Sequence, residues 1–340
     1  MIGRVVGKYK ILGQLGEGGM GIVYRAAHVV LGSPAAVKVL LPQFTQDTVV
    51  VDRFFQEAKA ASGIRHAGVV EVFDYGRLPN GQAYIAMELL RGEDLASFLA
   101  RHGKLAAPLA AQIAMQVLSA LDATHMVGVI HRDLKPDNIY LVRDTGAPGA
   151  IRVKILDFGI AKLVGTSPAA QRTPRPKTKG GSILGTPAYM APEQCRGGVE
   201  LDARADLYAV GCILFELLTG RPPFVGGGDG EVMAMHIYEP PPRLSNLEPD
   251  LPVELDALLA KLLTKVPEDR IPSAAYALAS LERAGLAPVA GEIVLPGAHP
   301  GLEAVSLGPP PPEPMRWLPF AVIGGAFVIA IAVAVVIGVT

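Results

Sequence analysis

The hydrophobic pattern of this sequence changes near residue 94, and that change limits the possible fold more than any other feature. Before Asp94, short apolar runs are separated by glycine turns, as in strands. After it, apolar residues recur at helical spacing. A small sheet-rich part followed by a larger helical part predicts an α+β chain with two lobes and a cleft between them. The expected strands are Tyr9–Leu15, Ile22–His28, Ala35–Leu40, Val69–Tyr75, Tyr84–Leu89 and Val153–Leu156, and the expected helices are Asp52–Gly63, Asp94–Arg101, Leu109–Met126, Ala205–Leu218, Pro252–Thr264 and Ser273–Ala284.

The composition favours a folded chain with a large core. Hydrophobic residues make up 50% of the 340 residues and charged residues 19%. The formal net charge of −1 gives no general attraction to nucleic acid, so we expect no nucleic-acid partner. Cys195 and Cys212 are too few for a disulfide framework and fit a reducing compartment. Residues 1–9 lack the apolar run of a signal peptide.

The C-terminal end of the sequence predicts a membrane anchor. Between Leu318 and Val339 no residue is charged and almost all are aliphatic or small. About 20 such residues in a helix span a hydrocarbon core of about 30 Å. Arg316 and Trp317 stand at the start of this run, as interfacial anchors do. A buried core helix is the alternative, although core helices rarely stay uncharged for so long.

The residues in and around this predicted span suggest its orientation in the membrane and its pairing with a second copy. Positive charge precedes the span and none follows it, so we expect a single-pass protein of the cell membrane with its bulk in the cytoplasm. Ala326, Ala330, Ala334 and Gly338 recur every four residues, a pattern that suggests a homodimer. The predicted organisation is a tail at 1–8, a first lobe at 9–90, a second lobe at 91–284, a Pro- and Gly-rich linker at 285–316, and a transmembrane helix at 317–339 in the lipid bilayer.

A glycine-rich run near the N-terminus carries the pattern G-x-G-x-x-G. Strand-like residues follow it and no G-K-[ST] does, so neither a dinucleotide-binding turn nor a Walker A loop fits. Two interpretations remain: an ordinary hairpin turn, or a flap whose backbone amides approach phosphate oxygens because no Cβ holds them away. The run consists of Leu15, Gly16, Glu17, Gly18, Gly19, Met20, Gly21, Ile22 and Val23.

A lysine interrupts the apolar strand Ala35–Leu40. Lys38 should be at least partly buried there, and a buried lysine seldom lacks a partner. Glu57, in the predicted helix Asp52–Gly63, is the candidate carboxylate. The alternative is an exposed edge-strand lysine with a solvated helix glutamate.

Two short runs beyond residue 130 identify a family. His131-Arg132-Asp133-Leu134-Lys135-Pro136-Asp137-Asn138 matches the signature H-R-D-L-x-x-x-N throughout, and Asp157-Phe158-Gly159 follows a strand-like run. The segment from Gly185 to Glu193 resembles the end of a kinase activation loop. Together with the glycine loop and Lys38, these runs resemble the eukaryotic-like serine/threonine kinases of bacteria over about residues 8–284. Lysine two residues after the aspartate is the pattern of kinases that act on serine and threonine.

That resemblance implies the two-lobed protein kinase fold, a small β-rich N-lobe and a larger helical C-lobe, with ATP and divalent ions, Mg²⁺ or alternatively Mn²⁺, between them. Protein substrates are the implied partners. Structural roles are implied for a pair between Glu193 and Arg270 and for Asp206 as an anchor of the 131–138 loop. The implied catalytic residues are Asp133, Lys135 and Asn138, the metal ligands are Asn138 and Asp157, and the nucleotide-binding residues are Leu15 to Val23, Ala36, Lys38, Glu57, Glu88 and Leu90, with Met87 as gatekeeper before the hinge Glu88–Leu90.

The segment 162–181 is long and rich in proline and basic residues. It reads either as a solvated loop or as a site of autophosphorylation, in which case Arg132 would receive the phosphate. The candidates are Thr178, Ser182 and then Thr173. Two other functions are alternatives to a protein kinase. A pseudokinase scaffold would lack one of the catalytic residues, and none is missing. A nucleotide-binding oxidoreductase conflicts with the strand that follows the glycine loop.

Overall fold

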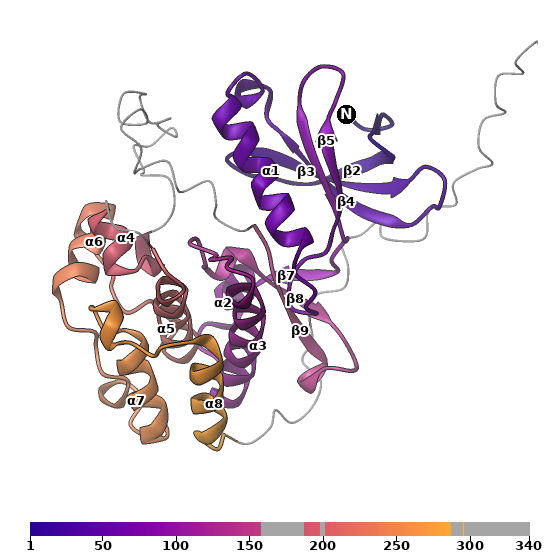
Figure 1. Cartoon of the computed structure of the whole chain (residues 1–340). Helices are drawn as coiled ribbons and strands as arrows, with labels where there is room; N and C mark the ends of the chain where they lie inside the picture. Colours follow the sequence, from indigo (N-terminus) through magenta and orange to yellow (C-terminus); the bar gives the residue numbers. More distant parts are fainter. Residues whose placement is uncertain (158–186, 198–200, 287–294, 296–340) are drawn as a thin grey trace, which may run out of the picture. The chain divides into compact units, whose positions relative to one another are not determined.

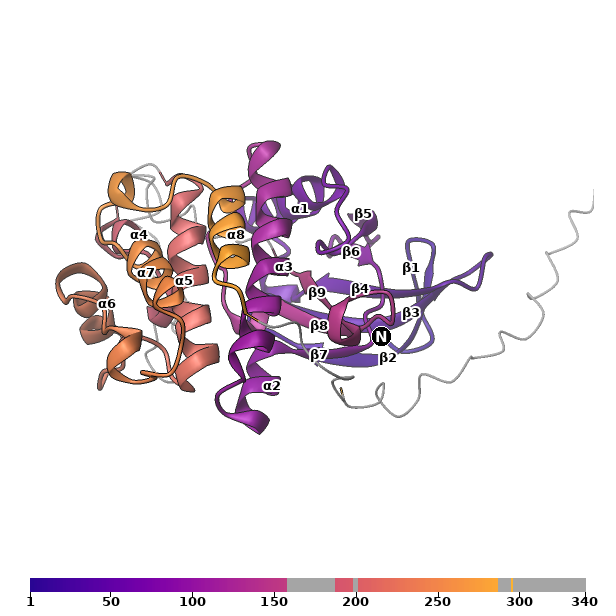
Figure 2. The ribbon, with the colours of Figure 1, turned by 90° about the horizontal axis from the view of Figure 1, so that it is seen from below.

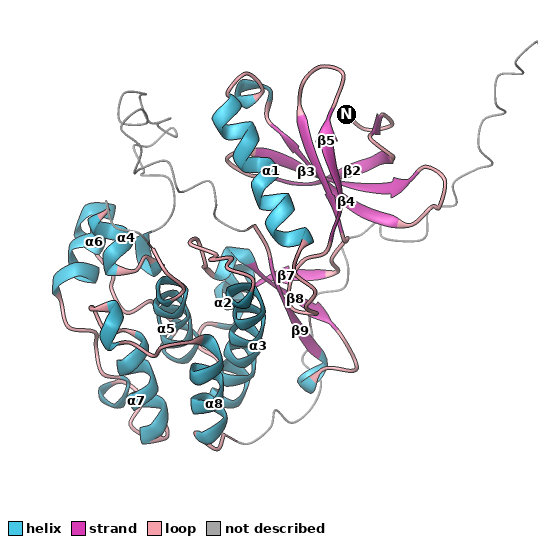
Figure 3. Ribbon diagram, viewed as in Figure 1, coloured by secondary structure: helices cyan, strands magenta, loops and turns pink. Residues whose placement is uncertain are grey.

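The computed structural model describes residues 1–157, 187–197, 201–286 and 295. Within them, strands gather in the N-terminal part and helices in the C-terminal part, as Figures 1 and 3 show. This confirms the predicted two-lobed α+β fold. Among the described residues no helix is both long and apolar enough to cross a membrane. The expected span at 317–339 lies outside them.

The N-lobe is built on an antiparallel sheet in the order β1-β2-β3-β4-β6-β5. One helix, α1 (Thr48–Ser62), accompanies it and begins at Asp47, whose carboxylate accepts hydrogen bonds from the N–H groups of Val49 and Val50 at 3.0 and 3.1 Å. The strands are β1 (Val5–Val6), β2 (Tyr9–Glu17), β3 (Gly21–His28), β4 (Pro34–Leu40), β5 (Val72–Arg77) and β6 (Ala83–Met87).

The C-lobe is mainly helical, with a small sheet in the order β7-β8-β9. Helix α5 is apolar on almost every side and correspondingly buried, and α3 packs against both α5 and α8 (Figure 2). The elements are β7 (Gly92–Asp94), α2 (Leu95–His102), α3 (Ala107–Met126), β8 (Ile139–Arg143), β9 (Ile151–Ile155), the 3₁₀ turn η6 (Pro187–Tyr189), α4 (Pro192–Arg196), α5 (Arg204–Thr219), α6 (Asp229–Tyr238), α7 (Val253–Leu262) and α8 (Ala274–Arg283), with single 3₁₀ turns elsewhere.

Several predicted boundaries were wrong. The predicted strand Val69–Tyr75 begins only at Val72, because Val69 instead bridges to Ile155 of the C-lobe sheet. The strand predicted to reach Leu89 ends at Met87. Elements β1, β7, β8, α4 and α6 were not predicted. Four of them, β1, β7, β8 and α4, have five residues or fewer, so local periodicity carries little signal for them.

The space around Gly21, the first residue of β3, allows a prediction about the stability of the N-lobe. A Cβ at Gly21 would lie 2.8 Å from the backbone oxygen of Val39, whereas a Cβ at Gly13 of β2 would meet nothing within 4 Å. Since a backbone atom cannot move aside cheaply, Gly21→Ala should lower the free energy of unfolding by about 1–3 kcal/mol. Gly13→Ala is the matched control and should change it much less. Urea unfolding of both variants checks this, and equal midpoints would contradict it.

Candidate active site

The glycine run joins two antiparallel strands, β2 and β3. Gly16 pairs with Val23 and Glu17 with Ile22, and the N–H of Gly18 donates to the Gly21 carbonyl at 2.9 Å. The register shifts between Gln14 and Gly16, so Leu15 stands at an irregularity of β2. A glycine loop that leads into a strand, not a helix, excludes the dinucleotide-binding turn.

Strand β4 presents Ala36 and Lys38 on one face, because side chains alternate along a strand. Val37 and Val39 pack on the other face in the small N-lobe core. Ala36 is paired with Met87 of β6, the predicted gatekeeper. The predicted hinge residues Glu88–Leu90 follow β6 and lie outside both sheets.

Lys38 forms the central ion pair of the site with Asp157. The Lys38 Nζ donates to Asp157 Oδ1 at 2.7 Å across 119 residues of sequence. Burial acts to lower the pKa of Lys38, but the charges of Asp157 and Glu57 outweigh it, and the net pKa is raised. For Asp157, whose side chain is 51% exposed, partial loss of solvation acts to raise the pKa, and Lys38 outweighs it, with smaller help from His131 and Lys135, so the net pKa is lowered. Both groups are therefore held in their charged forms.

This geometry refines the prediction for Glu57. Glu57 was the candidate partner of Lys38 in the sequence analysis. In the structure Lys38 donates its hydrogen bond to Asp157, and Glu57 raises the pKa of Lys38 through its charge. Asp157 has φ of +45°, a left-handed conformation that aspartate tolerates better than most residues. Asp157 stands two residues beyond the end of β9.

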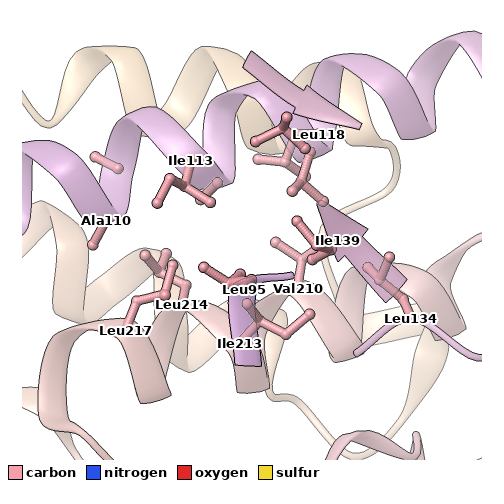
Figure 4. Packing of buried hydrophobic residues seen from close by; sticks show 14 of the residues in the cluster. Leu95, Ala110, Ile113, Leu118, Leu134, Ile139, Val210, Ile213, Leu214 and Leu217 are labelled. Atoms are coloured by element: carbon pink, nitrogen blue, oxygen red, sulfur yellow. The ribbon is translucent and has the colours of Figure 1, made fainter. Parts of the chain in front are cut away.

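The loop 131–138 is fastened to the C-lobe core by Leu134. This side chain is 3% exposed and packs among α3, α5 and β8, close to Val210 and Ile139 (Figure 4). Asp206, buried in α5, accepts the N–H of His131 through Oδ2 and that of Arg132 through Oδ1, both at 2.8 Å. The predicted anchoring role of Asp206 is confirmed.

His131 links this loop to the residue before Asp157. Its Nδ1 accepts the N–H of Asp133 at 3.3 Å, so the neutral ring carries its proton on Nε2 and donates it to the Leu156 carbonyl at 2.9 Å. The φ of Arg132 is +65°, and its carbonyl accepts from Gln194 Nε2 at 2.8 Å. Such a conformation costs energy and persists because the bonds around it hold it.

Two hydrogen bonds fix the position of Asn138 in this loop. Its Nδ2 donates to the Asp133 carbonyl at 2.8 Å, and its own carbonyl accepts the N–H of Leu156 at 2.9 Å. Carboxylate and amide oxygens are the donors that hard divalent cations prefer, and Mg²⁺ commonly uses one or two protein ligands together with substrate phosphates. Asn138 and Asp157 fit that donor set. Within the described residues no cluster of three or more His, Cys, Asp or Glu side chains could form a metal site by itself.

A small pocket lies beside Asp133, on the side of the loop that faces η6. It is lined by Asp133, Lys135, Tyr189 and Met190, among others. The predicted pair of Glu193 and Arg270 is confirmed nearby: two parallel bonds of 2.6 Å join the guanidinium and the carboxylate, both buried.

Four contacts at the site were not predicted. Lys154 of β9 forms an ion pair with Glu88, whose carboxylate also accepts the N–H of Glu71 at 2.8 Å. Tyr189 donates to Glu216 at 2.6 Å, and His125 Nε2 lies 2.8 Å from Asp206 Oδ2. Each joins residues that are far apart in sequence, and no local pattern would have revealed the pairing.

Some predicted residues lie outside the described part of the chain. They are Phe158, Gly159, the phosphorylation candidates Thr173, Thr178 and Ser182, and Thr186.

Comparison with known proteins agrees with this geometry. Residues 9–280 match the model of the protein kinase domain. Pkn1, a serine/threonine-protein kinase of Myxococcus xanthus, is 44% identical over 276 residues, which is 81% of this chain and 38% of that protein. PknH of Mycobacterium tuberculosis is 40% identical over 80% of this chain and 41% of its own length. The chain thus spans about half the length of these curated relatives, or less.

A solved structure shows the same fold. The crystal structure of the Mycobacterium tuberculosis PknI kinase domain is 30% identical, with a TM-score of 0.63 over 84% of this chain and 99% of the PknI chain. A two-lobed fold with this loop, ion pair and glycine turn defines a protein kinase domain. The chain belongs to the protein kinase family, among the bacterial serine/threonine protein kinases. Membership implies ATP and a divalent metal ion, and the pseudokinase alternative is not favoured.

His236 of α6 predicts how the stability of this domain depends on pH. Burial, with the nearby charge of Lys265, lowers the pKa of His236 to about 4, and the nearby backbone of Ala188 and Pro187 partly offsets this. In the unfolded chain the imidazole of His236 binds a proton near pH 6.5, whereas in the folded chain it stays neutral at that pH. The contribution of neutral His236 to the free energy of unfolding is therefore fully present above pH 6.5. It is lost as the pH falls toward 4, by up to about 3 kcal/mol. Urea unfolding at pH 6.5 and 4.5 should show a smaller loss in His236→Asn than in wild type, and equal losses would contradict this.

Proposed function

We propose that this chain transfers the γ-phosphate of ATP to serine or threonine hydroxyls of proteins, with Mg²⁺ or Mn²⁺. One observation carries the proposal: the predicted catalytic residues form a continuous set of bonds. Lys38 bonds Asp157, the adjacent Leu156 N–H bonds the Asn138 carbonyl, and the Asn138 amide bonds the Asp133 carbonyl. Such a set fixes charges and ligands before the reaction, which is the main work in phosphoryl transfer.

The residues divide the reaction between them. The acceptor oxygen forms a bond to the γ-phosphorus while the bond from that phosphorus to the leaving ADP oxygen breaks, and Asp133 takes the hydroxyl proton. Lys38 holds the α and β phosphates, and Lys135 stands beside Asp133 to neutralise the transferring group. A metal ion bound by Asn138 and Asp157 would neutralise charge on the β and γ phosphates. The glycine loop and the hinge hold the rest of the nucleotide.

The first test is incubation of the purified full chain with ATP and Mg²⁺, followed by mapping of phosphorylated residues. Wild type should label serine and threonine, and Asp133→Asn should not. Asp250→Asn, which changes an exposed carboxylate, is the control. Equal labelling by wild type and Asp133→Asn would refute the role of Asp133, and labelling of tyrosine alone would refute the serine/threonine specificity.

We further propose that the chain phosphorylates its own segment 162–186, at Thr178, Ser182 or Thr173. What supports this is the arginine before the catalytic aspartate, Arg132, whose Nε is buried without a hydrogen-bond partner among the described residues. A phosphate adds roughly −1.5 to −2 charge and pairs well with arginine. Mass spectrometry of active protein that finds no phosphate between residues 162 and 186 would overturn it.

The membrane association proposed for the chain rests on the uncharged run at 317–339, with the kinase domain in the cytoplasm and a homodimer through the small-residue face. A charged residue at the centre of a span costs about 2.5–3.5 kcal/mol. We therefore expect the wild-type chain to sediment with membranes after carbonate washing, and Ile331→Arg to be extracted in part. Ile331→Leu is the matched control. Wild-type protein that stays in the supernatant would contradict the anchor, and a span that does not crosslink would contradict the dimer.

A further inference from the structure

The wall of the pocket beside Asp133 is supported from behind by α6. The turn η6 contributes Tyr189 to the pocket lining and packs against both α5 and α6. Its buried residues are Pro187 and Ala188. A shift of α6 would therefore change the position of the pocket wall.

His236 is the polar residue of α6 at this contact. It is completely buried, and its Nδ1 lies 2.8 Å from the hydroxyl of Tyr208 on α5. Phe224 meets the imidazole edge-on, with ring centroids 4.9 Å apart. The imidazole is thus held in a single orientation.

A pair of cations secures the same cluster. Lys265 donates to the Met235 carbonyl, next to His236, at 3.2 Å, and its ammonium stands 4.2 Å from the Phe224 ring centre. The guanidinium of Arg270, which binds Glu193, lies 5.0 Å from the ring centre of Tyr208. The cluster therefore connects α6 to the buried ion pair at the end of the segment that starts with η6.

One atom of this cluster lacks a partner. The Nε2 of His236 is buried and makes no hydrogen bond within the described part of the chain. An unpaired buried polar atom costs about 1–3 kcal/mol and calls for an explanation. The backbone of Ala188 and Pro187 is close enough to influence the imidazole. If Tyr208 donates to Nδ1, then Nε2 carries the proton and is a donor opposite carbonyl acceptors.

We propose that His236 is a positioning residue for the protein acceptor: its Nε2–H completes a hydrogen bond to the carbonyl of Pro187 or Ala188 when an acceptor hydroxyl binds at Asp133, and so fixes η6 beside Asp133. The inference rests on the proposed phosphorylation of protein hydroxyls. It concerns the acceptor alone, because η6 lines the pocket at Asp133 whereas the predicted nucleotide residues lie on β2–β4, α1 and the predicted hinge.

The test compares three substitutions of His236 in the full chain. Glutamine places an amide nitrogen near the position of Nε2, asparagine imitates Nδ1, and phenylalanine imitates neither. A random-sequence peptide library with one central serine or threonine serves as the acceptor. We expect His236→Phe and His236→Asn to raise the KM for the peptides about tenfold, the equivalent of one hydrogen bond. His236→Gln should recover most of this, and the KM for ATP should stay within about twofold in all three.

If His236 only stabilised the fold, the three variants would rank differently in their KM for the peptides. In that case the KM would follow the thermal stability of the variants, and the KM for ATP would rise in parallel; either result overturns the proposal. His66→Asn, which removes an imidazole between α1 and β5, is the control and should leave the KM for the peptides unchanged.

Hydrogen exchange separates this inference from the proposed function. The amides of residues 187–197 should exchange faster in His236→Phe than in wild type, whether or not transfer occurs. Unchanged exchange overturns the positioning role while leaving the kinase activity intact. Wild type that phosphorylates no peptide and no protein refutes the proposed function, and with it the role of His236 in acceptor binding.

Discussion

Replacing Asp157 with asparagine is expected to lower kcat/KM about a thousandfold, equivalent to about 4 kcal/mol of transition-state stabilisation. The structure gives the reason. Asp157 is both an oxygen donor suited to a metal ion and the hydrogen-bond partner of Lys38 at 2.7 Å. Neutralising it removes one ligand charge and leaves the ammonium of Lys38 without its nearest counter-charge. Steady-state kinetics at several Mg²⁺ concentrations measures the loss and shows how much of it excess metal restores.

The contact between Lys38 and Asp157 also predicts that substitutions of the two residues will have non-additive effects on kcat/KM. Because Lys38 and Asp157 act through one contact, Lys38→Met combined with Asp157→Asn should cost little more than the worse single substitution. Additive losses would show that the two residues act independently and would contradict the pairing. Asp144→Asn, which breaks the ion pair with Arg152 at the other end of the C-lobe sheet, is the control and should change kcat/KM by less than about twofold.

Replacing Arg270 with methionine should lower the free energy of unfolding by about 3–5 kcal/mol. The side chain of Arg270 is 0% exposed and that of Glu193 only 8%, so the substitution leaves a buried carboxylate without its partner. It also removes donors from the carbonyls of Thr264, Arg204 and Lys265. Urea unfolding followed by circular dichroism measures the loss.

Two further variants show whether burial explains that effect. Arg204→Met breaks a more exposed ion pair with Asp202 and should cost at most about 1 kcal/mol. Adding Glu193→Leu to Arg270→Met should recover part of the stability, because no unpaired charge then stays buried. Equal losses of stability in Arg270→Met and Arg204→Met would show that burial of the unpaired carboxylate is not the cause.

How well the sequence predicted each part of the protein depended on the distance between the interacting residues. The loop from His131 to Asn138 and Asp157 were recognised because their groups lie within short runs of fixed spacing. Helices α3 and α5 were located within two residues at each end, since long apolar patterns are strong signals. The short strand β7 was missed, and the end of β6 was misplaced, because pairing with segments distant in sequence decides where these strands begin and end.

The sequence by itself determined the family and the residue types of the site, because the carboxylate, the cations and the oxygen ligands that phosphoryl transfer needs stand in short motifs that can be read from the sequence. Only the tertiary structure decided how those residues meet. It brought Asp157 to Lys38 across 119 residues, joined Lys154 to Glu88 at the predicted hinge, and set His236 behind the wall of the pocket at Asp133. Such contacts result from the packing of whole lobes, and no local periodicity encodes them.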